Sequence, residues 1–377
     1  MTFTIDMLPA DEGDALWIEY GADPVRRILI DCGRRSAYRA AAARLATDER
    51  GLELFVLTHV DADHIAGAVP LLQDARFGPA KVKDVWFNGW RHLNGLHWDP
   101  RKDAPETLGA QQGEYFGALL QDRGYPWNAA FGGFAVKVPD DGPLPRVELD
   151  GGMALTLLGP TTAKLEDLRA RWEKELAAVA PGTRIDPGDY ERALEVLGRD
   201  RRQGPDVLGG VHETPIVLPD LLEVPFTPDD GEPNGTSITF LAEYDGLAVV
   251  FGADAHAPQV EASLRRLLAE RGIDRLPLAA FKLSHHGSAR NTSSELLRLV
   301  SCSHYLVSTN GTRHHHPDPE TLARVLDAAG EGVTFHFNYE SDRTRPWLDG
   351  DLQQQLGYRA TGPDGDDGAR VRVGDAG

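Results

Sequence analysis

The sequence predicts a mixed α/β fold that carries polar clusters at the ends of its strands. Runs typical of β-strands dominate the N-terminal part, and strand-like and helix-like runs alternate after residue 236. Three apolar runs end directly in His or Asp residues, at positions 58–64, 252–254 and 284–288. Ligand-type residues repeated at strand ends favour metal binding over separate structural roles.

The N-terminal part reads as several strands followed by a strand–loop–helix unit. Turns that contain Gly, Pro or Asp separate its apolar runs. Strands are expected at residues 3–5, 15–20, 27–33, 52–57 and 82–88. An Ala-rich stretch over 36–50 and an apolar pattern over 65–73 predict helices.

Residues 89–230 differ in character from the rest of the chain. They contain helix-like stretches near 107–122 and at 163–178, followed by Pro/Gly-rich, charged sequence. Around their start lies a patch of aromatic and His residues, made of Trp86, Trp90, His92, His97 and Trp98. We interpret much of this segment as an insertion or a substrate-facing elaboration. Core or interface packing is the simpler role for the tryptophans, and stacking on a base is the alternative.

The C-terminal part returns to an alternating pattern of strands and helices. Strands are expected at residues 236–241, 246–251, 278–283, 304–308 and 332–337. Helices are expected at residues 258–271, 293–300 and 318–329. The predicted organisation is one domain over 1–360 with the insertion at about 89–230, and a Gly/Asp-rich, disordered tail over 361–377.

Composition limits the protein class. The 377 residues are 41% hydrophobic, which suffices for a large core, and no apolar run reaches membrane-spanning length. No signal peptide is recognised, and the distant Cys32 and Cys302 suggest no disulfide framework, so a cytoplasmic location fits best. The net charge of −19 counts against holding long nucleic acids, although a local basic groove is compatible with it.

The first polar cluster holds two histidines and two carboxylates within six positions. His59 and Asp61 are two residues apart, so in extended backbone they point to the same side. Asp63 and His64 then open a helix. Packed together, these four side chains would repel and desolvate one another without a cation. Helix capping by Asp63 is the simpler alternative, but it accounts for that residue only.

Two further clusters follow later strands. Asp254 comes just after one strand, where a carboxylate can bridge two metal ions, although a lone Asp there is more often a turn or cap residue. His285 and His286 follow another strand. His316 lies in a run of three histidines before a helix, and a solvated surface run is an equally good interpretation of it.

Seven segments in order resemble motifs of the metallo-β-lactamase fold superfamily, and most closely those of the ComEC-type competence protein domain and its stand-alone relatives. The first metal motif is His59-x-Asp61-x-Asp63-His64, with Asp61 where many members carry His. The matching segments are residues 12–19, 28–33, 58–67, 234–238, 252–255, 282–288 and 316–320. The third metal motif has no clear counterpart, and by position His212 is the only candidate for it.

The resemblance implies an αββα sandwich with a large insertion and with metals at one edge. It places His59, Asp61 and Asp254 on one ion. The second ion would be held by Asp63, His64, Asp254 and one of His285 and His286. One or two divalent ions are expected, and the many carboxylates make Mn²⁺ as suitable as Zn²⁺.

The same resemblance suggests residues that act on the substrate. Asp63 would orient the attacking water, and whichever of His285 and His286 is not a ligand would face the substrate or donate a proton. His316, Lys282 or Arg290 would neutralise a phosphate oxygen. Ser288 and Asn234 are further candidate contacts, and capping is the favoured role of Asn234.

The leading functional hypothesis is a metal-dependent phosphodiesterase, most specifically a nuclease. The alternatives are a hydrolase of a small ester or phosphodiester with the 89–230 segment as a lid, and a component of a larger complex that needs a protein partner. No membrane contact is expected, and the oligomeric state stays open.

Overall fold

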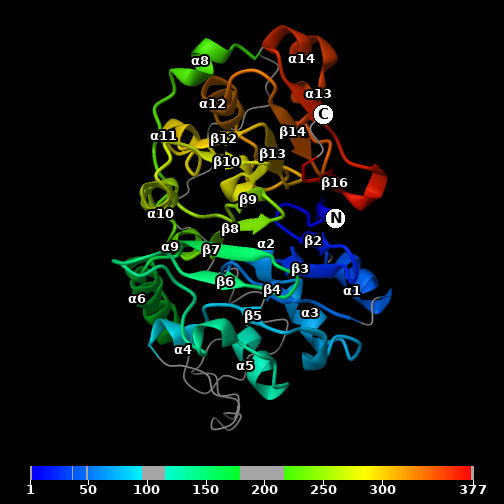
Figure 1. The fold of residues 1–377 in the computed structure, drawn as a ribbon, viewed down its shortest axis with the longest axis vertical. Helices are drawn as coiled ribbons and strands as arrows, with labels where there is room; N and C mark the ends of the chain where they lie inside the picture. Colours follow the sequence, from blue (N-terminus) through cyan, green and yellow to red (C-terminus); the bar gives the residue numbers. More distant parts are fainter. Residues whose placement is uncertain (1, 36, 48–49, 96–114, 179–215, 375–377) are drawn as a thin grey trace.

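The computed structural model describes residues 2–35, 37–47, 50–95, 115–178 and 216–374. Within these ranges, two β-sheets pack against each other, and helices cover their outer faces (Figure 1). The predicted mixed α/β sandwich is therefore confirmed. No helix in the described part of the chain is both long and apolar enough to cross a bilayer.

The first sheet has six strands in the order β16-β1-β2-β3-β4-β5. They are β1 Thr2–Met7, β2 Leu16–Gly21, β3 Arg26–Ile30, β4 Leu54–Val56, β5 Val85–Trp86 and β16 Ala369–Arg372. Side chains alternate between its faces, as the two-residue period of a strand requires. Ile28 and Ile30 join the core between the sheets, whereas Leu29 packs towards the helices on the outer face. Those helices are α1 Tyr38–Thr47, α3 Ala68–Gln73 and α5 Tyr115–Asp122.

The second sheet has eight strands in the order β15-β14-β13-β11-β9-β8-β7-β6. They are β6 Arg146–Glu148, β7 Ala154–Gly159, β8 Thr239–Tyr244, β9 Leu247–Phe251, β11 Ala280–Lys282, β13 His304–Val307, β14 Thr334–Phe337 and β15 Arg359–Thr361. Strands β9, β11, β13, β14 and β15 run parallel, as their crossover helices require. The main crossover helices are α10 Ala257–Arg271, α11 Ser294–Arg298 and α12 Pro319–Ala329.

Smaller elements complete the described chain. A separate parallel pair joins β10 Leu276–Leu278 to β12 Val300–Cys302. The remaining helices are α2 Ala62–Ile65, α4 Trp90–Leu93, α6 Thr162–Ala178, α8 Leu218–Leu222, α9 Glu232–Gly235, α13 Arg345–Leu348 and α14 Gly350–Leu356. The helix predicted over 65–73 is divided into α2 and α3 around Gly67. The Cα of Gly67 lies against the backbone of Cys32, and a Cβ there would be 2.0 Å from the Cys32 carbonyl oxygen.

Two expectations about domain organisation need correction. The tail over 361–377 was expected to be disordered, yet β16 pairs antiparallel with β1, and Arg370 binds Asp6 through two hydrogen bonds of 2.6 and 2.7 Å. Strands β6 and β7 lie inside the segment interpreted as an insertion, so residues 146–159 belong to the second sheet. The other limits of that segment stay a prediction.

The aromatic patch is divided by the fold. Trp86 is completely buried and packs edge-on against Phe131 and Phe240, which gives it a core role. Trp90 begins α4, while His97 and Trp98 lie outside the described residues. The buried position of Trp86 therefore does not agree with a role for this residue in a lid.

Candidate metal centre

The first cluster lies where β4 ends. His59 is in the loop after this strand, and Asp63 and His64 are in the short helix α2. Asp31, which follows β3 with φ of 57°, holds the loop in place. Its carboxylate accepts hydrogen bonds from the Thr58 backbone N–H and hydroxyl at 2.8 Å each, and from His64 Nδ1 at 2.7 Å.

The second sheet contributes the other clusters from the carboxyl ends of β9 and β11. Asp254 follows β9, and His285 and His286 follow β11. Both histidines have left-handed backbone conformations, with φ of 47° and 57°. Such values are uncommon outside glycine and persist only where the surroundings impose them, typically at functional sites. A hydrogen bond of 2.8 Å from the His285 N–H to the Ala253 carbonyl joins the two loops.

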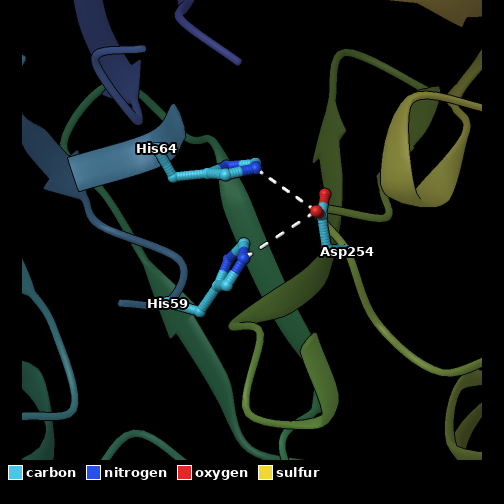
Figure 2. A group of neighbouring side chains, drawn as sticks. All are labelled: His59, His64 and Asp254. Atoms are coloured by element: carbon cyan, nitrogen blue, oxygen red, sulfur yellow. Dashed lines mark ion pairs between the residues drawn. The ribbon is translucent and has the colours of Figure 1, made fainter. Parts of the chain in front are cut away.

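One carboxylate oxygen lies at the centre of the arrangement. The Nε2 atoms of four histidines surround Asp254 Oδ2, with His64 at 3.3 Å, His286 at 3.6 Å, and His59 and His285 at 3.8 Å. Figure 2 shows His59 and His64, from the first sheet's side, both directed at Asp254. The structure thus brings together histidines from two sheets around a single carboxylate.

The other ring nitrogen of each histidine already has a partner. His286 Nδ1 is 2.8 Å from the Ser308 carbonyl and His64 Nδ1 is 2.7 Å from Asp31, and both partners are acceptors, so Nδ1 carries the hydrogen. His59 Nδ1 lies 3.0 Å from Thr58 Oγ1, and His285 Nδ1 lies 3.0 Å from Asn291 Oδ1. This arrangement directs the lone pairs of Nε2 to the centre, as in metal sites where the second nitrogen is hydrogen-bonded.

The buried atoms at the centre lack hydrogen-bond partners. The Nε2 atoms of His59, His64 and His286 are buried and unpaired, as are one oxygen of Asp61 and one of Asp254. Buried polar groups are nearly always satisfied, so a group of unpaired ones indicates a missing ligand. A divalent cation fits this donor set of imidazole nitrogens and carboxylate oxygens.

The aspartates of the first motif lie on either side of the centre. Asp61 Oδ2 is 3.6 Å from His59 Nε2, and Asp63 Oδ2 is 3.5 Å from His286 Nε2. In the described part of the chain, four groups of three residues each have ligand atoms within 4.8 Å of one another. Two of these groups are His59, His64 and Asp254, and Asp63, His64 and His286. Of the adjacent pair, His286 therefore lies with Asp63, and His285 lies on the side of a neighbouring cavity.

The carboxylates give the centre a strong preference for positive charge. Burial by itself lowers the pKa of His286, but Asp254 and Asp14 outweigh it and raise that pKa to about 9. In the same way Asp254 and Asp229 raise the pKa of His285 to about 10, and Asp254, Asp31 and Asp63 hold that of His64 well above its usual value. Without a metal, protons on the histidines therefore balance the carboxylates.

Lys282 does not have the position expected of a substrate contact. It is completely buried, and its Nζ donates to Asp14 Oδ2 at 2.6 Å. The expectation that it neutralises a substrate phosphate is wrong, because its charge is used inside the protein. Asn234 is also buried and donates to Asp229 Oδ2 at 2.7 Å, in accordance with its favoured structural role.

The other predicted contacts lie together. Ser288, Arg290, His285 and His316 line a cavity of about 350 Å³ beside the centre. His212, the candidate for the third metal motif, lies outside the described residues.

Sequence reasoning underestimated several supporting residues. Asp14 has one buried oxygen without a partner, 3.5 Å from His286 Nδ1. The turn that carries it touches the first cluster so closely that a Cβ on Gly13 would be 1.7 Å from the Asp63 carbonyl oxygen. Asp229 and Asn291, which hold His285, were not singled out. Of these residues, only Gly13 and Asp14 could have been found from the sequence, because they lie in the segment 12–19 that resembles a family motif.

Two sheets packed face to face, with a His/Asp cluster where their strand ends meet, define an α/β protein with a candidate metal centre. The chain belongs to the metallo-beta-lactamase superfamily, whose family model matches residues 10–311. Membership suggests a metal-dependent hydrolase, and superfamily members generally bind divalent metals. Closeness to the ComEC-type domain stays a prediction.

Comparisons with individual proteins add little to this assignment. No curated protein matches the chain. Among solved structures, a mutant of CmlA beta-hydroxylase is similar with a TM-score of 0.39 and 10% identity, over 98% of this chain and 54% of that chain. The chain spans about half the length of that protein, and a similarity this low carries no functional argument.

Proposed function

We propose that the protein is a metal-dependent hydrolase that cleaves phosphodiester bonds. The observation that carries this proposal is the convergence of four imidazole Nε2 atoms on Asp254 Oδ2, within 3.3–3.8 Å. Imidazoles and carboxylates at one edge of a metallo-beta-lactamase fold are suited to metal-assisted hydrolysis.

The proposed ligands form two sets that share Asp254. His59, Asp61 and Asp254 would hold one ion. A second ion would be held by Asp63, His64, Asp254 and His286. Zn²⁺ and Mn²⁺ both suit nitrogen and oxygen donors. When bound, such ions supply a water of lowered pKa and neutralise charge on a phosphoryl group.

The protein's own side chains would position the reactants. The Asp63 side chain is 13% exposed, against 0–2% for His64, His286 and Asp254, and its carboxylate would orient the attacking water. Asp31 and the Ser308 carbonyl fix the rings of His64 and His286, so the ligand geometry is set before substrate arrives. His285, held by Asn291, faces the cavity in which a substrate would lie.

The substrate class divides into two candidates. A nuclease is the leading expectation from the family resemblance. A small phosphodiester or ester is the second candidate, and the limited volume of the neighbouring cavity, about 350 Å³, favours it. A need for a protein partner is a third proposal, on which the described structure gives no specific observation.

The proposal is tested with chelated protein to which Mn²⁺ or Zn²⁺ is returned. Substrates are single-stranded DNA, double-stranded DNA, RNA and bis-p-nitrophenyl phosphate. We expect metal-dependent cleavage in the wild type and none in Asp63→Asn, whose thermal unfolding should be almost unchanged. Equal activity of Asp63→Asn, or hydrolysis that persists in the chelator, would contradict the mechanism.

A further inference from the structure

The cavity beside the metal centre is bounded by three segments of the chain. It is lined by residues from 224–229, 288–291 and 314–320, together with Arg324 and Arg343. His285 lies in its wall, and His285 Nε2 is 3.8 Å from Asp254 Oδ2. The cavity therefore adjoins the proposed site of reaction, and His285 is the side chain that they share.

A single buried arginine fixes the walls of this cavity. Arg324 of α12 donates from Nη1 to the carbonyl oxygens of Ala289 at 2.7 Å and Thr292 at 3.0 Å. Its Nη2 donates to the Val224 carbonyl at 3.3 Å. Because one rigid guanidinium joins both bounding loops to α12, the cavity is preformed rather than a gap between independent loops.

The acidic residues in the walls already have partners. Asp229 accepts hydrogen bonds from Asn234 at 2.7 Å and Asn291 at 3.0 Å. Asp318 accepts from the Ala289 N–H at 2.7 Å, and Glu320 interacts electrostatically with Arg324. The carboxylates of the walls are thus hydrogen-bonded or ion-paired within the protein.

Basic residues line the cavity as well. Arg290 and Arg343 line the cavity, and Arg290 contacts Asp230 at 2.9 Å while a third of its side chain stays exposed. His316 is only 5% exposed, and its Nδ1 lies 3.4 Å from Asp318 Oδ1. Its ring lies 5.1 Å from that of His285. Two arginines and a histidine in the walls of a cavity beside the candidate metal centre favour an anionic ligand.

The size of the cavity limits that ligand. Its volume of about 350 Å³ is at the lower end of the range for small-molecule pockets. A polynucleotide would instead need a basic surface that follows its backbone, and the chain's net charge is −19.

We propose that this cavity, with Arg290, Arg343 and His316, binds the anionic end of a compact ester or phosphodiester, so that the protein acts on small molecules rather than on nucleic acid strands. This inference rests on the proposed hydrolase function. It assigns the second candidate substrate class and adds Arg343 as a residue that determines specificity.

The test uses the metal-loaded protein and two separate measurements. Binding of phenyl phosphate is measured by calorimetry, and hydrolysis is compared between bis-p-nitrophenyl phosphate and a single-stranded oligonucleotide. Arg290→Ala and Arg343→Ala remove cations from the wall, and Thr227→Trp fills the rim from an exposed loop position. Arg298→Ala, an exposed arginine of α11 outside the cavity, is the matched control.

We expect each arginine variant to weaken phenyl phosphate binding and to raise KM for the small diester by about tenfold, the effect of one charge-assisted hydrogen bond. Metal content and kcat should stay near wild type in both. Thr227→Trp should block the small diester, and Arg298→Ala should change nothing.

Two results would overturn the inference. Unchanged binding and KM in both arginine variants would show that the cavity is not the anion site, even if the protein hydrolyses diesters. Faster cleavage of the oligonucleotide than of the small diester, unaffected by Thr227→Trp, would place a strand across another surface. If nothing is hydrolysed, the hydrolase proposal fails, whereas arginine-dependent binding of phenyl phosphate would still support the cavity as an anion site.

Discussion

Lys282 Nζ lies 2.6 Å from Asp14 Oδ2, and both side chains are almost completely enclosed. Lys282 ends β11 of the second sheet, while Asp14 precedes β2 of the first, so the ion pair joins the two sheets. The other Asp14 oxygen lies 3.5 Å from His286 Nδ1. This ion pair therefore joins the two sheets and also supports a histidine of the candidate metal centre.

Replacing Lys282 should strongly destabilise the protein. Lys282→Met leaves the Asp14 carboxylate buried without its counter-ion, which costs about 3–5 kcal/mol of unfolding free energy. Urea denaturation measures the loss. The matched control is Lys83→Met, which removes an exposed lysine that pairs with Glu53 and Asp150 and should cost less than about 1 kcal/mol. Similar losses in the two variants would contradict a buried pair.

Asp31 should control metal affinity without binding the metal itself. Its carboxylate accepts from Thr58 and from His64 Nδ1, and therefore fixes the ring of a proposed ligand. Asp31→Asn should weaken metal binding by about 10- to 100-fold, the usual effect of losing such support. Competition with a fluorescent chelator measures the affinity, and circular dichroism checks the fold. An unchanged affinity would show that His64 needs no such support.

The stability of the metal-free protein should fall in alkaline solution. The carboxylates raise the pKa of His286 to about 9 and that of His285 to about 10. A raised pKa in the folded state means that the stabilising protons are fully present below about pH 6.5, the ordinary value for histidine, and are lost as the pH rises through 9 to 10. The pKa values of Asp63 and Asp254 are lowered, so these groups stay ionised throughout this window.

Thermal unfolding between pH 6 and 10, with chelator and with added Mn²⁺, measures this effect. We expect the melting temperature to decline with pH only in the chelated sample, because a bound cation replaces the protons. The same linkage predicts that metal binding releases protons, which calorimetry in buffers of different ionisation enthalpy detects. Identical pH profiles with and without metal would exclude a cation at this position.

The C-terminal strand should contribute to stability but not to metal binding. Arg370 of β16 binds the buried Asp6 of β1 through two hydrogen bonds. Arg370→Ala should cost about 1 kcal/mol, because Arg370 is 57% exposed and Asp6 keeps its ion pair with Arg44, and metal content should be unchanged. Arg359→Ala, on the exposed face of β15, is the control and should have little effect. A loss of metal in Arg370→Ala would link the tail to the site.

Local pattern predicted much of the candidate site. His59, Asp254 and His286 each follow an apolar run, and the carboxyl ends of buried strands leave little freedom in where the next residues lie. The role of Lys282 was not predictable in the same way, because its partner is 268 positions away and comes from the other sheet. Without knowledge of such a contact, a lysine at a strand end is expected to lie on the surface.

The C-terminal tail shows a different reason for error. Ala369, Val371 and Val373 are buried and alternate with exposed arginines, which is the pattern of a strand with one covered face. Gly and Asp residues before and after this short run dominated the composition and predicted disorder. A four-residue strand gains its stability from a neighbour, here β1, which composition cannot reveal.

The convergence on Asp254 has a mechanical consequence. His59 and His64 are carried by the first sheet, while Asp254 and His286 are carried by the second. An ion held between them would cross-link the two sheets where their strand ends meet. Gain or loss of the ion would then alter how firmly the two sheets are held together at this edge. The distance between the sheets would respond to metal binding.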